Sequence, residues 1–299
     1  MTAAPLRSFL FIPGDSDKKL ARAVSCGADA VILDLEDSVA PDAKPAARDR
    51  VAAFLRSAPH GAGAPQYWVR INPLDSGLAL ADLAKIVEAA PAGIFQPKVA
   101  GPADVQQLSF YLDALEAAHG LEGGRIRIIP IATETAQAPF HLGAFATAGL
   151  ARLAGLTWGA EDLAAAIGAS GNRDASGDWA FTFRMARSLC LLAAHAAGVQ
   201  AIETLHADFR DDAGLESSSR AARAEGFTGR LAIHPAQVEV INAAFQPSSA
   251  EVEHAQRVVA AFAAHPRAGA VGLDGKMVDI PHLKQAEQIL AQAKAFGLI

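Results

Sequence analysis

Eight short apolar segments recur along the chain, and each is followed by a turn residue or a charged side chain. The segments cover residues 6–12, 29–35, 66–71, 92–96, 127–131, 151–158, 199–203 and 229–233. Patterns typical of helices separate them, among them 44–56, 102–119, 138–148, 182–197 and 217–225, with an irregular acidic loop at 205–214. Strands that are apolar on both faces belong to a parallel sheet covered by helices. Eight such units in 299 residues predict an α/β fold, the (β/α)8 TIM barrel, whose active sites lie at the carboxyl ends of the strands.

The composition changes near Gln246, beyond the eighth strand. A helix at about 250–264, a glycine-rich hairpin-like stretch at 268–280 and a last helix at 281–295 are expected there. We therefore expect a barrel domain at residues 1–245 and a C-terminal helical appendage at residues 246–299.

The charge and cysteine content exclude several classes of protein. A formal net charge of −6 without a basic stripe argues against a nucleic-acid partner. Cys26 and Cys190 have no metal or redox spacing, which favours free thiols in a reducing, cytoplasmic compartment. The N-terminal stretch has no signal-peptide pattern, and no window of 18 residues is uninterruptedly apolar, so we expect no membrane span.

Polar side chains at the strand ends would share the barrel mouth. They are Glu36, Asp37, Arg70, Asn72, Lys98, Glu134, Asp162, Glu203 and His234. Glu134 and Asp162 follow neighbouring strands and could share Mg²⁺, which usually takes one or two protein carboxylates plus water and substrate oxygens. Arg70 is suited to holding a carboxylate through two parallel hydrogen bonds. This set predicts a small oxyacid substrate that chelates a metal.

Each of these residues also has a structural interpretation. Arg70 could form an ion pair with Glu36 or Asp37 at the barrel end. Glu134 and Asp162 could be helix-capping acids, because both precede helices. Only one of the adjacent Glu161 and Asp162 is expected to face the mouth. Lys98 could be a surface amine, since a Schiff-base role needs an apolar pocket that depresses its pKa; His234 before Pro235 is more typical of a hydrogen-bonded structural histidine.

The motifs taken together resemble the citrate lyase β-subunit-like family of the wider aldolase and malyl-CoA lyase group. The matching segments, in order over nearly the whole chain, are residues 10–14, 29–39 with Lys44 and Arg48, 69–72, 97–98, 133–135, 159–163, 229–235 and 277–281. The resemblance implies a TIM barrel that binds Mg²⁺ through Glu134 and Asp162 rather than Glu161. It places Arg70 on the substrate carboxylate or keto-acid product.

The resemblance also gives a role to the appendage. Met277–Pro281 is similar to the family's C-terminal motif, whose aspartate acts as acid and base in the active site of a neighbouring subunit. It therefore implies that Asp279 is catalytic and that the chain forms a homotrimer or hexamer; by position alone, Asp279 is a helix N-cap ahead of Pro281. Glu36 and Asp37 are expected to order metal-bound water or Arg70. Lys18, with Lys19 and Arg22, could meet coenzyme A phosphates or form a solvated helix face.

The activity implied is that of a Mg²⁺-dependent carbon–carbon lyase of the oxo-acid type. Its substrate would be a citramalyl-CoA or malyl-CoA type thioester, and its products acetyl-CoA with pyruvate or glyoxylate. The same residues would also suit a malate-synthase-like condensing enzyme or thioesterase, or an aldolase on free hydroxy-keto acids. A further alternative is the β subunit of a citrate lyase complex, which acts on an acyl-carrier-protein thioester, or a non-catalytic subunit of such a complex.

Overall fold

The computed structural model describes residues 5–61 and 63–299 of the chain. Their contacts separate a large compact unit, Leu6–Asn242, from a smaller one that contains Ala243–Ile299. The larger unit holds eight parallel strands: β1 (Ser8–Pro13), β2 (Ala30–Asp34), β3 (Gln66–Arg70), β4 (Gly93–Gln96), β5 (Arg127–Pro130), β6 (Gly155–Thr157), β7 (Gln200–Glu203) and β8 (Gly229–Ala232). All eight fall within the segments predicted as strands, except that β1 extends to Pro13.

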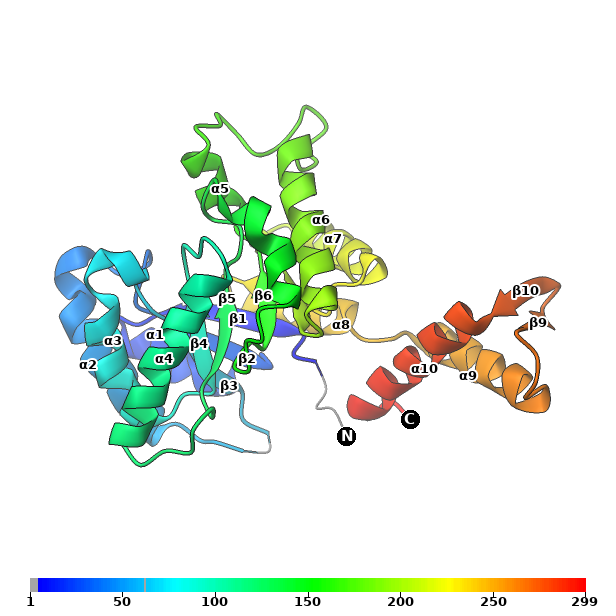
Figure 1. Cartoon of the computed structure of the whole chain (residues 1–299), viewed down its shortest axis with the longest axis horizontal. Helices are drawn as coiled ribbons and strands as arrows, with labels where there is room; N and C mark the ends of the chain where they lie inside the picture. The colour runs from blue at the N-terminus through cyan, green and yellow to red at the C-terminus, as the bar shows by residue number, and fades with distance from the viewer. Residues whose placement is uncertain (1–4, 62) are drawn as a thin grey trace. The chain divides into compact units, whose positions relative to one another are not determined.

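The strands form one sheet that curls into a nearly closed barrel (Figure 1). The ladder runs β5-β4-β3-β2-β1-β8-β7-β6, so only β5 and β6 lack a continuous pairing. Two isolated parallel bridges, Ile128 with Leu153 and Ile131 with Thr157, join these last two strands. The N–H of Ala132 also donates to the carbonyl of Thr157 at 2.7 Å. The predicted TIM barrel is therefore confirmed, with a seam between β5 and β6.

Inward-facing side chains fill the barrel. The buried cluster consists of Phe9, Ala30, Ile32, Trp68, Phe95, Ile129, Ile131, Ile202 and Leu231. Phe95 lies edge-on to both Phe9 and Trp68, with ring centroids 5.8 and 5.7 Å away, an arrangement that aromatic rings prefer. A Cβ at Gly93 would lie 2.1 Å from the Trp68 ring, so only glycine leaves room for this tryptophan on the neighbouring strand.

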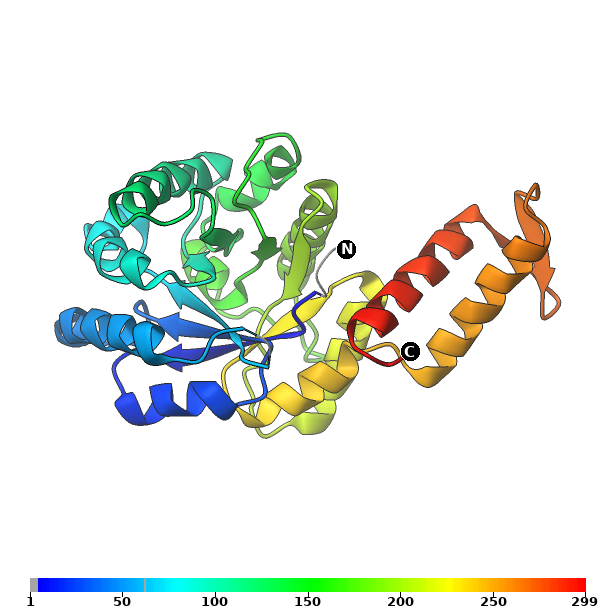
Figure 2. The ribbon, with the colours of Figure 1, turned by 90° about the horizontal axis from the view of Figure 1, so that it is seen from below.

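Helices surround the strands on the outside of the barrel (Figure 2). The α-helices are α1 (Asp17–Arg22), α2 (Lys44–Ser57), α3 (Ala79–Ile86), α4 (Pro102–Ala118), α5 (Ala160–Ala166), α6 (Phe181–Ala196), α7 (Asp212–Glu225) and α8 (Ala236–Ala244). Short 3₁₀ helices complete the layer: η1 (Ala23–Ser25), η2 (Pro41–Ala43), η3 (Leu74–Ser76), η4 (Val87–Ala89) and η5 (Ala138–Ala146).

Three local expectations differ from the structure. The segment 138–148, predicted as an ordinary helix, is the 3₁₀ helix η5, with Pro139 in its first turn. The acidic loop predicted up to Gly214 ends earlier, because Asp211 caps α7 by accepting from the N–H of Gly214 at 2.9 Å. Helix α8 follows the eighth strand directly, where no helix was predicted.

The smaller unit is a helical hairpin with its own core. Helix α9 (Ser249–Ala264) and helix α10 (Ile280–Ala295) flank an antiparallel pair, β9 (Ala270–Leu273) and β10 (Lys276–Asp279). Val258, Phe262, Val271, Val278 and Ala286 belong to the buried cluster that joins these elements. Across the described part of the chain, no helix is long and apolar enough to cross a membrane.

Candidate active site

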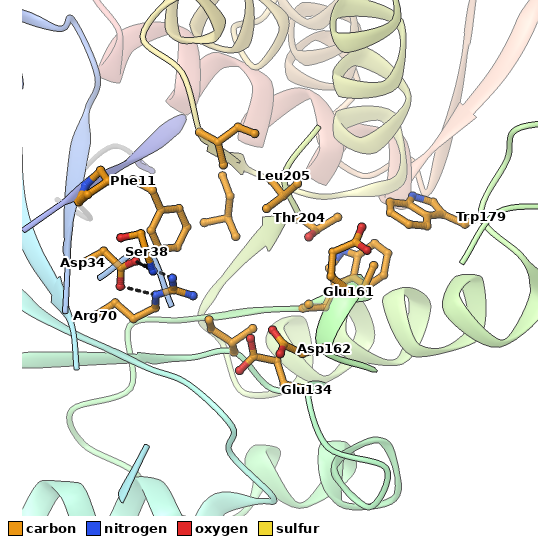
Figure 3. Close-up of a pocket in the computed structure, with 17 residues that line it drawn as sticks. Phe11, Asp34, Ser38, Arg70, Glu134, Glu161, Asp162, Trp179, Thr204 and Leu205 are labelled. Carbon is orange, nitrogen blue, oxygen red and sulfur yellow. Dashed lines mark hydrogen bonds and ion pairs between the residues drawn. The ribbon is translucent and has the colours of Figure 1, made fainter. Parts of the chain in front are cut away.

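A cavity of about 240 Å³ opens at the carboxyl ends of the strands (Figure 3). Its lining combines the polar residues Asp34, Ser38, Arg70, Glu134, Glu161 and Asp162 with the apolar residues Phe11, Ile131, Trp158, Trp179, Leu205 and Leu231. Trp158 and Trp179 contact each other with ring centroids 5.0 Å apart. The volume suits a small oxyacid and its reacting bonds, while a larger carrier group would have to extend out of the opening.

Arg70 is fixed by two acids, Asp34 at the end of β2 and Glu36 in the loop that follows. Its Nε and Nη2 donate to the two carboxylate oxygens of Asp34 at 2.7 Å each, and Nη1 lies 2.9 Å from Oε2 of Glu36. Asp34 was not among the predicted site residues. Two of the five N–H donors of the guanidinium are engaged in hydrogen bonds to Asp34, so the others remain for a ligand carboxylate. The predicted ion pair with Glu36 is confirmed, and Asp37 is not part of it.

Glu134 and Asp162 lie close together and both line the cavity, as Figure 3 shows. Burial raises the pKa of Glu134 well above its ordinary value. Burial also raises that of Asp162, but hydrogen bonds from Lys98 and Glu134 outweigh it and lower the pKa of this carboxyl. A Cβ at Gly159 would lie 2.9 Å from Cγ of Glu134, so glycine at this position leaves the space that the Glu134 side chain occupies.

Lys98 reaches into the middle of the acids. Its Nζ forms a short ion pair with Asp162 and lies 3.5 Å from Asp37, 3.6 Å from Glu36 and 3.9 Å from Glu134. Burial alone would lower the pKa of Lys98, but the charge of Glu134 and the hydrogen bond to Asp162 raise it above its ordinary value. The side chain is therefore a charged ammonium at neutral pH, which argues against a Schiff-base role.

Glu36 is buried beside Arg70 and Lys98. Burial raises its pKa to about 7, although the charges of Arg70 and Lys98 oppose this shift. The loop that carries it is held by Lys44, whose Nζ donates to the carbonyls of Leu35 and Glu36 at 2.9 and 2.8 Å. Asp37 is exposed and contacts only the rim of the site through Lys98.

Two predicted residues lie elsewhere, and one expectation was wrong. Lys18 is exposed on α1 and does not line the cavity. Asp279 precedes α10 in the smaller unit, where its carboxylate forms a short ion pair with His282. Glu161 and Asp162 both line the cavity, contrary to the expectation that only one would do so. Glu161 is turned away from Glu134 because it accepts from Nδ2 of Asn172 at 2.9 Å.

The donor set fits a hard divalent cation. Within the described residues no group of three or more His, Cys, Asp or Glu side chains could hold a metal. Two carboxylates of adjacent strands are nevertheless sufficient for Mg²⁺, which keeps water and substrate oxygens as its other ligands. The Lys98 ammonium between Glu134 and Asp162 shows that this position already attracts positive charge.

Residues 7–235 match the family described as HpcH/HpaI aldolase/citrate lyase, and residues 187–298 match a C–C bond lyase family of the TIM-barrel fold. The chain is 36% identical to the mitochondrial citramalyl-CoA lyase of Rattus norvegicus, over 97% of this chain and 86% of the relative. It is 37% identical to a (3S)-malyl-CoA thioesterase of Cereibacter sphaeroides, over 99% of this chain and 97% of the relative.

A solved structure of similar sequence extends the comparison to ligands. The protein CitE from Mycobacterium tuberculosis, in complex with magnesium, acetoacetate and coenzyme A, superposes with a TM-score of 0.80 and 35% identity. The match covers 98% of this chain and 99% of CitE. Another structure of CitE contains magnesium and pyruvate. CitE of Mycobacterium tuberculosis is thus seen with magnesium, acetoacetate, pyruvate and coenzyme A.

Proposed function

Since the chain belongs to the HpcH/HpaI aldolase/citrate lyase family, we propose that it is a Mg²⁺-dependent carbon–carbon lyase. Its substrate is a 3-hydroxyacyl-CoA of the citramalyl-CoA or malyl-CoA type, and its products are acetyl-CoA and pyruvate or glyoxylate. The observation that carries this proposal is the shared cavity wall of Arg70, Glu134 and Asp162. An anion clamp beside a pair of metal-binding carboxylates suits a substrate with neighbouring hydroxyl and carboxylate groups.

Each residue has a defined part in this reaction. The free N–H groups of Arg70 bind the substrate carboxylate, while Asp34 and Glu36 fix the orientation of the guanidinium. Glu134 and Asp162 would hold the metal, which would supply Lewis-acid polarisation of the substrate oxygens. The Asp279 carboxylate removes the hydroxyl proton, the C–C bond breaks, the keto acid leaves with its new C=O bond, and the bond electrons remain on the enolate of the acetyl thioester. Asp279 then returns that proton to the enolate carbon.

Asp279 acts from a second subunit in this proposal, which makes the active unit a homotrimer or hexamer. Its exposed position in the smaller unit leaves the carboxylate accessible to another chain. The hydrogen bond from His282 lowers the pKa of Asp279, so that the residue is ionised at neutral pH. It is therefore ready to remove a proton from acetyl-CoA in the synthetic direction.

Lys18 at the exposed face of α1 is proposed to meet the phosphates of coenzyme A, and a cytoplasmic location remains a prediction.

A thioesterase is the second candidate, because the malyl-CoA thioesterase of Cereibacter sphaeroides is as similar to the chain as the citramalyl-CoA lyase. A substrate panel separates the two. We expect citramalyl-CoA or malyl-CoA with Mg²⁺ to yield keto acid and acetyl-CoA in equal amounts, measured by coupled reduction of the keto acid and by chromatography of the thioester.

Free coenzyme A thiol without keto acid would instead identify a thioesterase. Omitting Mg²⁺ and adding a chelator is the control, and turnover that continues there would contradict the metal-dependent lyase. Turnover of the acyl-carrier-protein thioester alone would favour the citrate lyase complex.

Gly159→Ala tests the position of the metal-binding pair. The new methyl group would lie 2.9 Å from Cγ and 3.2 Å from Oε1 of Glu134, so the carboxylate must shift. We expect Mg²⁺ affinity to fall about tenfold, the loss typical when the support of a metal ligand is disturbed. Isothermal titration calorimetry measures the Mg²⁺ affinity of the variant and of the wild type. Gly143→Ala is a matched control, because a Cβ there meets no atom within 4 Å; equal affinities in both variants would contradict the assignment.

A further inference from the structure

Lys98 holds a backbone conformation that lysine rarely adopts. Its φ is 54°, in the left-handed region, and it is one of only three non-glycine residues with positive φ in the described chain. Such conformations are strained for a residue with a side chain and tend to persist at functional sites. Here the turn directs the backbone N–H to Oε2 of Glu134 at 2.6 Å and sends the side chain to the same group of acids. The strained turn thus makes one residue contact Glu134 twice.

The ammonium of Lys98 lies among four carboxylates of the site. It contacts Asp162 and lies 3.9 Å from Glu134, the two side chains assigned to the metal. The buried Glu36 and the exposed Asp37 are on its other side, at 3.6 and 3.5 Å. The Lys98 side chain remains 26% exposed, so it has space to move outward. If it leaves Asp162, it still has two carboxylate partners.

From this arrangement we propose that Lys98 is an internal counter-cation of the metal site, which balances Glu134 and Asp162 before the metal arrives and competes with it for Asp162. This inference rests on the metal site of the proposed function. Two cations cannot share one carboxylate contact without repulsion at a few ångströms. Lys98 is therefore a positioning residue that weakens metal binding and keeps the two carboxylates together in the metal-free protein.

The test measures the affinity of the full-length protein for Mn²⁺, an ion that shares the oxygen ligands of Mg²⁺. The electron paramagnetic resonance signal of free Mn²⁺ reports how much of the ion is unbound. We expect Lys98→Met to bind Mn²⁺ about tenfold or more tightly than the wild type. Its melting temperature without metal should fall, and the rise on adding metal should be larger. Lys98→Arg keeps the charge and should keep the wild-type affinity. Lys98→Gln serves as a second neutral variant if the methionine variant does not fold.

Lys85→Met is the matched control, because it removes one positive charge from an exposed pair with Asp49 outside the cavity. It should leave the Mn²⁺ affinity unchanged. If wild-type protein binds Mn²⁺ and the neutral Lys98 variants bind it equally or more weakly, the competition is refuted while the metal site stands. If Mn²⁺ binds neither the wild type nor these variants, the metal site of the proposed function fails, and the role of Lys98 with it.

Discussion

Asp279→Asn is expected to lower the rate of keto-acid release by about 10²–10⁴-fold, the range that a positioned general acid contributes. Asparagine keeps the shape of the side chain but cannot transfer a proton to the enolate carbon. Mg²⁺ affinity should not change, because Glu134 and Asp162 belong to the barrel unit. The coupled assay measures the rate of keto-acid release, and isothermal titration calorimetry measures the Mg²⁺ affinity. Exchange of acetyl-CoA methyl protons with deuterium, followed by NMR, reports the proton transfer itself.

Coexpression tests whether Asp279 acts on another subunit. Chains with Asp279→Asn and chains with Asp162→Asn are each expected to be inactive alone. If the barrel and Asp279 of one site come from different chains of a closed ring, about a quarter of the sites in a random mixture should be intact. Activity absent from the mixed oligomer would show that Asp279 serves its own barrel. Asp274→Asn is the matched control, since this exposed acid of the same hairpin pairs with Arg257 and its removal should preserve turnover.

Glu134→Gln and Asp162→Asn are each expected to reduce turnover by at least about 10³-fold, because both the electrophile and the substrate orientation depend on this pair. Mg²⁺ binding should weaken to the limit of calorimetric detection. The double variant should be hardly worse than either single one, as is usual for groups that act as a unit. Calorimetry and the coupled keto-acid assay provide the measurements.

Glu161→Gln is the control for this pair. The side chain lines the same cavity but is bound to Asn172, so the variant should retain metal binding. Variants of Glu134 and Asp162 that keep Mg²⁺-dependent turnover would contradict the assigned ligands.

The barrel could be predicted from the sequence because its strands are buried on both faces. A run such as Ala30–Leu33 is fully apolar and shows no competing helical period. The 3₁₀ helix η5 was missed because apolar periodicity does not distinguish it from an α-helix. Helix α8 was missed because it follows β8 after only three residues, too short a connection to separate the two patterns.

The site was predictable where a polar residue follows a strand within a few residues, as Glu134 does after β5. Asp34 was overlooked because it is the last residue of β2, beside two more conspicuous acids. Its pairing register with Arg70 on β3 is a signal that could have identified it, since neighbours in register project to the same side. The position of Lys98 depends on its left-handed backbone conformation. A lysine in the sequence does not predict such a conformation. The Trp158–Trp179 contact joins residues on either side of α5, so only the folded loop reveals it.

The seam of the barrel has a consequence for how the protein moves. β5 and β6 are the one strand pair held by isolated bridges, and the proposed metal ligands Glu134 and Asp162 follow these two strands. Segments with few backbone hydrogen bonds open locally more often than the rest of a fold. A ligand that contacts both Glu134 and Asp162 would hold the two sides of that seam together. Occupancy of the active site would therefore reduce local opening between β5 and β6. Ligand binding at the active site and closure of the barrel between β5 and β6 are then coupled in one equilibrium.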